Sequence, residues 1–436
     1  MGKHISDFLR LHLFKGDIAL WMVYFLLCVV SVVEIYSASS NLTFQGGHHW
    51  DPVVDQVEFL FYGFLVILLV SRIPCKYFRL LSTLGILLSI VLLVWVLTKE
   101  ETNEASRWLT VPVVGVSFQP SEVAKPCLLL FVAGQLTKIN QARRKLTTRI
   151  GRAKAAKAMR QGYWTIMVVS AVVCGLIAPE NLSTALMIAL VVFVMMYVGN
   201  VSGKYLLRTI GAALLLVSLF VGWVAVTPDE ELSGHARVLT WKHRVEEKLG
   251  VQQSSLDEAD SANQYVITDK KRQEFTAHIA IANSNIIGRG AGNSVGRDFL
   301  PHAESDFIYA IIVEELGILG AFFVMMFYVW LFVLVWRIAR RSDRFFAAYL
   351  SIGLALMLVV QALVNMAVAV GLAPVTGQTL PLISHGGTSI LITSFCIGMI
   401  LSVSRYVERV SATKDQPAEV VPACETNEYA VAGSMQ

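Results

Sequence analysis

The sequence predicts an all-α, polytopic membrane protein with about ten transmembrane helices, both termini cytoplasmic, and a large extracytoplasmic loop between the seventh and eighth helices. The first observation is composition: 55% of the 436 residues are hydrophobic and 16% are charged, against roughly 25% charged residues in soluble domains. The second is that the apolar residues form separate runs, each close to the length of about 20 residues that a bilayer core requires. The third is that Lys and Arg gather in alternate connections.

The apolar runs define the elements in chain order. A polar stretch precedes the first run and no small-residue cleavage signal follows it, so we expect the first helix to be a retained anchor. The ten runs lie near residues 18–37, 55–72, 77–97, 119–137, 163–178, 183–199, 205–226, 307–336, 345–373 and 386–405.

The orientation follows from the rule that short, positively charged connections face the cytoplasm. Residues 138–162 hold nine Lys or Arg and no acidic residue, whereas 38–54 and 374–385 hold no Lys or Arg. Other basic positions lie in the leader, after the second run and after the eighth run: Lys3, Arg10 and Lys15; Arg72, Lys76 and Arg79; Arg337, Arg340, Arg341 and Arg344. Because the charged connections alternate, both termini are predicted to be cytoplasmic.

The chain divides into a membrane domain, residues 1–409, and a disordered cytoplasmic tail, residues 410–436. Within the domain, residues 227–305 form the extracytoplasmic loop, a functional candidate because long loops are usually either functional or disordered. Residues 238–249 place apolar side chains on one helical face, which suits either a helix at the lipid interface or a solvated loop helix. The net charge of +4 is small, so no nucleic-acid partner is expected.

A first polar cluster opens the fourth helix, in the segment FQPSEVAK that contains Gln119, Glu122 and Lys125. Pro120 suits a first helical turn, and the i, i+3 spacing places the acid and the base on one face. Ionisable groups at such depth usually face a cavity or a partner. A structural ion pair near the headgroups is the alternative.

A second cluster ends the long loop with GRGAGNS at residues 288–294. Alternate glycines permit turns that direct N–H groups at an anion, but the features of a P-loop are missing, so nucleotide binding is not expected. Asp306 follows where the chain enters the eighth helix at its outer end. It is either a functional carboxylate or a helix cap, since Asp favours N-terminal helical positions. Glu314 and Glu315 lie deeper, where we expect buried partners.

A third cluster joins the ninth and tenth helices at residues 371–389 and includes Ser384, His385 and Thr388. Proline, glycine and hydroxyl residues in so apolar a setting indicate broken backbone that lines a cavity, because unsatisfied peptide groups cannot face lipid. An ordinary re-entrant turn is the alternative.

These segments, in this order, resemble the motifs of the SEDS family (shape, elongation, division and sporulation) of peptidoglycan glycosyltransferases. The matching stretches are Arg107-Trp108 with FQPSEVAK, GRGAGNSVGRDFLPHAESDFIYAIIVEELG and GLAPVTGQTLPLISHGGTS, and the resemblance spans residues 18–405. The overall look of the motifs favours the division-type over the elongation-type branch. The chain departs from the family pattern at Glu180-Asn181, where Asp is common, at His302, where Glu is usual, and at His385, where Tyr is common.

The resemblance implies polymerisation of lipid II, the undecaprenyl-pyrophosphate-linked disaccharide-pentapeptide, at the outer face of the bacterial inner membrane. It implies that Asp306 is the catalytic carboxylate, and an inverting glycosyl transfer needs one positioned base. Glu122 and Lys125 match the polar pair near the family's central cavity. The other candidates for substrate or cavity contacts are Gln119, Arg107, Arg237, Arg289, Arg297, Ser384, His385 and Thr388. Of these, the arginines at 237, 289 and 297, with Lys242, are available to neutralise the leaving pyrophosphate.

The resemblance also implies a divalent cation, Mg²⁺ or Mn²⁺. No His/Asp cluster has metal-ligand spacing, so we expect the cation to be held through the substrate pyrophosphate, and no organic cofactor is expected. The implied partners are a class B penicillin-binding transpeptidase, other membrane proteins of the division machinery, and membrane lipid. The implied location is the division septum.

Other functions stay open at this point. A lipid II flippase would use the same cavity without chemistry, and an elongation-type polymerase would share the same motifs. An O-antigen-ligase-like transferase would not account for the three matched segments, and a scaffold would leave the polar clusters unexplained.

Overall fold

The computed structural model describes residues 14–38, 50–98, 109–110, 117–144, 149–226, 269–300 and 303–415. Each of the ten predicted runs is a helix. These helices are α2 (Ile18–Ala38), α4 (Asp51–Arg72), α5 (Cys75–Leu97), α6 (Pro120–Arg143), α7 (Arg149–Ile177), α8 (Leu182–Val198), α9 (Gly203–Val226), α14 (Ile308–Arg341), α15 (Phe345–Ala369) and α16 (Gly387–Asp415). The helical fold class is confirmed, with one small departure: β1 (Leu109–Thr110) and β2 (Ser117–Phe118) form an antiparallel pair.

Seven helices in the described part of the chain are long and apolar enough to cross a membrane, namely α2, α4, α5, α7, α14, α15 and α16. Helix α8 is apolar but has 17 residues. The outer face of α5 is apolar and exposed, with Leu80 at 70% and Leu84 at 62%, and large exposed apolar surfaces mark contact with a membrane or a partner. The chain is a multi-pass membrane protein.

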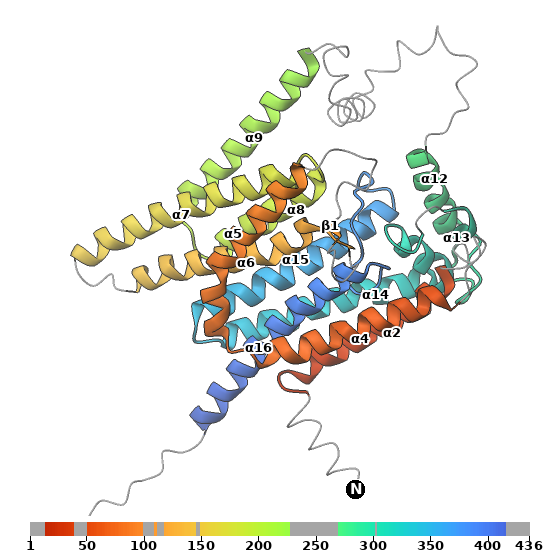
Figure 1. Cartoon of the computed structure of the whole chain (residues 1–436), viewed down its shortest axis with the longest axis horizontal. Helices are drawn as coiled ribbons and strands as arrows, with labels where there is room; N and C mark the ends of the chain where they lie inside the picture. Colours follow the sequence, from red (N-terminus) through yellow and green to blue (C-terminus); the bar gives the residue numbers. More distant parts are fainter. Residues whose placement is uncertain are drawn as a thin grey trace, which may run out of the picture.

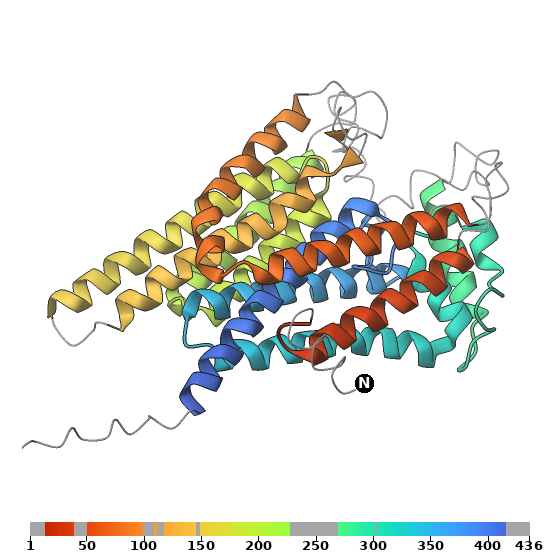
Figure 2. The ribbon, with the colours of Figure 1, turned by 60° about the horizontal axis from the view of Figure 1, so that its bottom comes forward.

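Helices α15 and α16 form the interior of the bundle, since 72% of an 18-residue apolar stretch of each is buried, against 28% for α5. Helix α16 lies along α4, and α14 lies along both α15 and α2 (Figures 1 and 2). A Cβ atom added at Gly63 of α4 would lie 2.5 Å from Ser394 Oγ, and one at Gly398 of α16 would lie 2.9 Å from Val70 Cβ. Small residues thus permit the close approach of α4 and α16, as is common between membrane helices.

Helix α14 is broken near its start, whereas the sequence predicted one continuous helix. Gly317 has φ of +73° and ψ of −179°, a conformation that L side chains rarely adopt. The freed backbone groups bond to residues 285–290: Ile318 N–H donates to Asn285 O at 3.3 Å, and Arg289 N–H donates to Glu314 O at 3.1 Å. The break therefore holds the end of the long loop against α14.

The predicted extracytoplasmic loop contains two described helices, α12 (Asp269–Ala282) and the short α13 (Gly296–Phe299). Both pack against α14 (Figure 1). Helix α16 continues to Asp415, past residue 409 where the predicted membrane domain ends. The amphipathic segment at 238–249 and the tail beyond Asp415 lie outside the described residues.

Candidate active site

Four parts of the chain meet at one end of the bundle: the start of α6, residues 303–307 before α14, the end of α15, and residues 370–386 between α15 and α16. The last of these segments has no regular helix or strand, and its residues 380–384 are buried. Irregular backbone at membrane depth is tolerated where protein buries it. The prediction of broken backbone between α15 and α16 is confirmed.

The backbone that carries Asp306 is held by three hydrogen bonds. The carbonyl oxygens of residues 304–306 each accept one from a different donor. In chain order, the donors are the His385 backbone N–H at 2.8 Å, the Ser384 hydroxyl at 2.5 Å and the Asn365 side-chain amide at 2.9 Å. Because all three donors come from α15 and the segment that follows it, the third sequence cluster fixes the position of the second.

The Asp306 side chain is half-buried and lies at the surface of the 370–386 segment. A Cβ atom added at Gly377 would lie 3.6 Å from Asp306 Oδ2, and Gly377 is itself exposed. The N-cap of α14 is Phe307, so Asp306 precedes the capping position. Whether this carboxylate serves as a helix cap or as a functional group therefore stays open, and its catalytic role stays a prediction.

Glu122 and Lys125 form an ion pair inside the bundle, with Lys125 Nζ 2.5 Å from Glu122 Oε1. Lys125 is fully buried and the Glu122 side chain is 13% exposed. The ammonium group also donates to the amide oxygens of Gln361 at 3.2 Å and Gln378 at 3.4 Å. A buried charge needs such a counter-charge and such hydrogen bonds. The predicted contact between the acid and the base is confirmed, and its partners lie in the protein interior.

A chain of hydrogen bonds joins this pair to Asp306. The side-chain amide of Asn365 donates to the Gln378 carbonyl oxygen at 2.7 Å as well as to that of Asp306. Gln378, which accepts from Lys125, donates in turn to the hydroxyl of Thr184 in α8 at 2.5 Å. The ion pair and the backbone of Asp306 therefore belong to one buried polar network, in which Gln378 and Asn365 are the connecting residues.

The glycine-rich loop encloses an anion, but the anion belongs to the chain itself. Glu314 and Glu315 are fully buried, and their carboxylates accept four backbone N–H groups of residues 292–296 at 3.0 to 3.2 Å. The Ser294 hydroxyl donates to Glu314 Oε2 at 2.5 Å. The expectation that both glutamates have buried partners is confirmed.

Arg289 and Arg297 lie in the same loop network. Arg289 Nη1 is 3.8 Å from Glu314 Oε1. Arg297 Nη1 donates at 3.0 Å to both the carbonyl and the hydroxyl oxygen of Ser37 in α2, and that hydroxyl donates to Glu315. Both arginines thus help to hold the loop on α2 and α14, and their role toward a pyrophosphate stays a prediction.

The remaining predicted residues are spread around this site. Gln119 is the half-buried N-cap of α6, and Thr388 is buried in the first turn of α16. Within the described part of the chain, His385 Nδ1 is buried without a hydrogen-bond partner. Arg107, Arg237, Lys242 and His302 lie outside the described residues.

Sequence reasoning missed Gln361 and Gln378 as members of the site, and it missed the function of Asn181. Gln361 is a polar side chain in the otherwise apolar α15, and that signal was available, because intramembrane polar groups usually have partners. Asn181 lies where the chain departs from the family pattern. Its side chain accepts from Thr184 N at 3.0 Å and so caps α8, which also supports the Thr184 hydroxyl that contacts Gln378.

The chain is similar to known proteins along nearly its whole length. The family model FTSW_RODA_SPOVE, described as cell cycle protein, matches residues 17–409. The chain is 31% identical over 406 residues to the probable peptidoglycan glycosyltransferase FtsW of Halomonas elongata, covering 90% of this chain and 91% of that relative. It is 26% identical over 418 residues to the protein of the same name from Lactococcus lactis subsp. lactis, covering 93% and 96%.

Solved structures share the fold. A chain from work on the structural coordination of polymerization and crosslinking by a peptidoglycan synthase complex aligns with a TM-score of 0.65 at 24% identity, covering 90% of this chain and 98% of that chain. The rod shape determining protein RodA of Thermus thermophilus aligns with a TM-score of 0.58 at 22% identity, covering 89% and 97%. The family match and the FtsW-named relatives identify the chain as a division-type member of the FtsW/RodA/SpoVE family of cell cycle proteins, the SEDS family.

Proposed function

We propose that the chain is a peptidoglycan glycosyltransferase that polymerises lipid II at the outer face of the inner membrane during septal wall synthesis. The observation that carries the proposal is the fixed position of Asp306, whose backbone is bonded to Asn365 and whose carboxylate lies beside the exposed Gly377. The names of the FtsW relatives support the same activity.

In the proposed reaction, a sugar hydroxyl of the acceptor attacks C1 of the donor from the face opposite the lipid pyrophosphate. The new C–O bond forms as the bond from C1 to the pyrophosphate oxygen breaks, and the hydroxyl proton passes to the Asp306 carboxylate. A positioned general base contributes about 10²–10⁴-fold to such a transfer. The leaving group departs as undecaprenyl pyrophosphate, and the configuration at C1 inverts because the attack comes from the opposite face.

Glu122 and Lys125 act in this proposal as positioning residues. They lie on the buried side of the network, and the Gln378–Asn365 connection carries their influence to the backbone of Asp306. Hydrogen-bonded polar networks in a protein interior favour one geometry, and here the Asn365 Nδ2 group and the Gln378 side chain each make two hydrogen bonds. We therefore expect loss of either residue to lower turnover by displacing Asp306, with substrate affinity changing less.

The divalent cation is proposed to arrive with the substrate. No group of three or more His, Cys, Asp or Glu side chains in the described part of the chain lies close enough to hold a metal, so those residues do not fit a resident metal. Mg²⁺ commonly binds through substrate phosphates with few protein ligands. The pyrophosphate of lipid II offers such oxygen atoms, and the proton transfer assigned to Asp306 does not involve the cation.

The proposed partner is a class B penicillin-binding transpeptidase, which would cross-link the new strands, together with other membrane proteins of the division machinery. Support comes from the fold shared with a chain of a peptidoglycan synthase complex in which polymerization and crosslinking are coordinated. The proposed location at the septum follows from the division-type relatives.

The test is polymerisation of lipid II by purified protein in lipid nanodiscs, with and without the transpeptidase. The proposal predicts glycan strands and release of undecaprenyl pyrophosphate, with a higher rate in the complex. Movement of lipid II between the leaflets of a liposome, without release of pyrophosphate in either preparation, would instead assign the chain as a flippase.

A further inference from the structure

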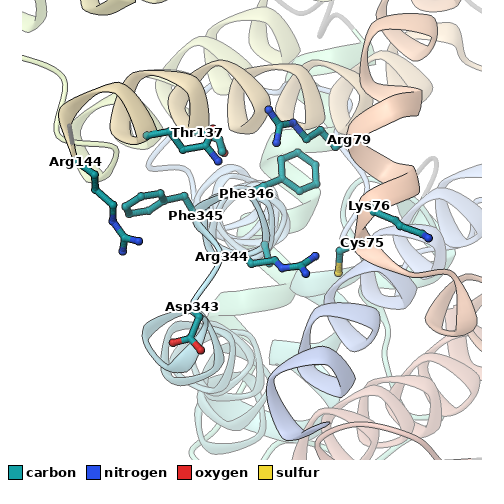
Figure 3. Close-up of a pocket in the computed structure, with 11 residues that line it drawn as sticks. Cys75, Lys76, Arg79, Thr137, Arg144, Asp343, Arg344, Phe345 and Phe346 are labelled. Carbon is teal, nitrogen blue, oxygen red and sulfur yellow. The ribbon is translucent and has the colours of Figure 1, made fainter. Parts of the chain in front are cut away.

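A basic cavity of about 550 Å³ lies at the other end of the bundle from Asp306. It is lined by the start of α5, the end of α6, and the connection between α14 and α15 (Figure 3). Helix α6 spans the distance between the two sites, since Glu122 lies in its first turn and Thr137 and Arg144 of the cavity lie at its end. The cavity is therefore separate from the site described above, at the end that the charge pattern predicts to be cytoplasmic.

The cavity carries an excess of positive charge. Lys76, Arg79, Arg144 and Arg344 line it together with a single acidic residue, Asp343. Such a concentration of cations raises the local concentration of anions, so an anionic ligand is the chemistry that this cavity fits.

Aromatic rings hold two of the arginines in place, one of them Phe345 of the cavity lining and the other Tyr406 of α16, which lies outside that lining. Arg144 stacks over the ring of Phe345 with its guanidinium carbon 4.4 Å from the ring centroid, and Arg344 stacks over Tyr406 at 4.7 Å. Figure 3 shows the Arg144 side chain beside the Phe345 ring, the Arg79 side chain beside the Phe346 ring, and the Arg344 side chain directed toward Cys75. Stacking leaves the N–H edges of a guanidinium free, and those edges match phosphate oxygens in bidentate geometry.

The surroundings of the cavity indicate a ligand with acyl chains. On α5, directly after Arg79, Leu80, Leu81 and Leu84 are exposed at 70%, 49% and 62%. An apolar outer face that adjoins a basic cavity at the end of membrane helices gives the two surfaces of an amphiphile: one for the headgroup and one for the hydrocarbon. Basic pockets between membrane helices on the cytoplasmic side bind anionic lipid headgroups in other proteins.

We propose that this cavity binds the phosphate headgroup of an anionic phospholipid from the inner leaflet, with the acyl chains lying along the outer face of α5. The headgroup joins three connections that are far apart in the sequence, those at α5, α6 and α15. Binding to the folded state stabilises it in proportion to the logarithm of ligand concentration over Kd. Anionic phospholipid should accordingly hold the α5–α6 pair against α15.

The experiment measures the apparent unfolding temperature of the purified full-length protein in nanodiscs of phosphatidylcholine with increasing phosphatidylglycerol. Lipid II is absent, so the result does not depend on glycosyl transfer. We compare wild type with Arg79→Gln/Arg144→Gln/Arg344→Gln, which removes three charges from the cavity. The matched control is Arg152→Gln/Lys154→Gln/Arg160→Gln, which removes three exposed charges from α7 at the same predicted side of the membrane.

Wild type and control are expected to reach half of their maximal gain in unfolding temperature at similar phosphatidylglycerol contents, while the cavity variant needs at least tenfold more of the lipid to reach half of its gain. An equal midpoint for all three proteins would overturn the proposal. So would equal stabilisation by inorganic phosphate alone in phosphatidylcholine nanodiscs, because the ligand would then be a free phosphate rather than a lipid.

A second measurement uses the wild-type protein and keeps the proposal testable if the triple variant does not fold. Photoactivatable phosphatidylglycerol with its reactive group at the headgroup should label peptides that contain Thr137 and Gln141, which line the cavity. Labelling confined to the start of α7, without these peptides, would contradict the assignment.

Discussion

The Glu122–Lys125 pair offers the sharpest test of the buried network. Glu122→Gln keeps the side-chain size but leaves the fully buried Lys125 ammonium with neutral amide oxygens at 3.2 and 3.4 Å. Removing one partner of a buried ion pair costs about 3–5 kcal/mol, because the other charge is left uncompensated. For Lys125→Met we expect the lower end, about 3 kcal/mol, since the remaining Glu122 carboxylate is 13% exposed to solvent.

The double variant Glu122→Gln/Lys125→Met removes both charges, and replacement of a whole buried pair by neutral groups is often close to neutral for stability. We therefore expect the double variant to unfold at a higher temperature than either single variant. Its loss of polymerisation should be little greater than that of Glu122→Gln alone, because residues in one network are not additive. Thermal unfolding in nanodiscs and lipid II polymerisation measure the two effects.

Lys138→Met is the matched control for this series, since Lys138 is an exposed residue of the same helix, and exposed substitutions usually change stability by less than about 0.5 kcal/mol. Strictly additive losses, with the double variant the least stable of all, would show that Glu122 and Lys125 are not coupled. The positioning role assigned to them would then be wrong.

Three further predictions concern the loop, the connecting amide and the topology. Gly317→Ala places a Cβ atom 2.4 Å from Gly288 N at φ of +73°, and this strain should lower the free energy of unfolding by about 1–3 kcal/mol. Thermal unfolding should show the loss for Gly317→Ala but not for Gly175→Ala, which has open space around its Cβ position; equal effects would argue against the docked loop. Asn365→Leu removes the shared donor to Asp306 and Gln378; it should lower the free energy of unfolding by about 1–3 kcal/mol and also lower the rate of polymerisation. A variant as stable and as active as wild type would contradict the network. In cells with a permeabilised outer membrane, an impermeant thiol reagent should label a cysteine at Ser255 but not one at the exposed Ala156, and the reverse pattern would invert the predicted orientation.

Much of the fold was predictable because a bilayer imposes simple rules on the sequence. Runs of about 20 apolar residues must be helices, since lipid offers no hydrogen bonds to the backbone, and all ten runs are helical in the structure. The polar clusters were predictable for the same reason. Charges and prolines in an apolar chain mark cavities or partners, and Lys125 and Asp306 both lie in one connected site.

The missing features depend on contacts between distant segments. Nothing local distinguishes Gly317 from a glycine tolerated within a helix, and its break becomes apparent once residues 285–290 bond to the freed backbone groups of α14. The glycine-rich loop has the pattern of an anion site, but the sequence does not show that Glu314 and Glu315 supply the anion. These contacts form only when the end of the loop packs against α14.

The measurement that tests the central claim most directly is lipid II polymerisation by the purified Asp306→Asn protein in complex with its transpeptidase. The exchange keeps the side-chain size and removes the basic carboxylate. Its backbone bond to Asn365 does not involve the side chain, so folding and complex formation should survive. If Asp306 is the general base, turnover should fall at least about 10²–10⁴-fold. A stable Asp306→Asn complex that makes polymer at nearly the wild-type rate would remove Asp306 from the reaction and contradict the proposed mechanism.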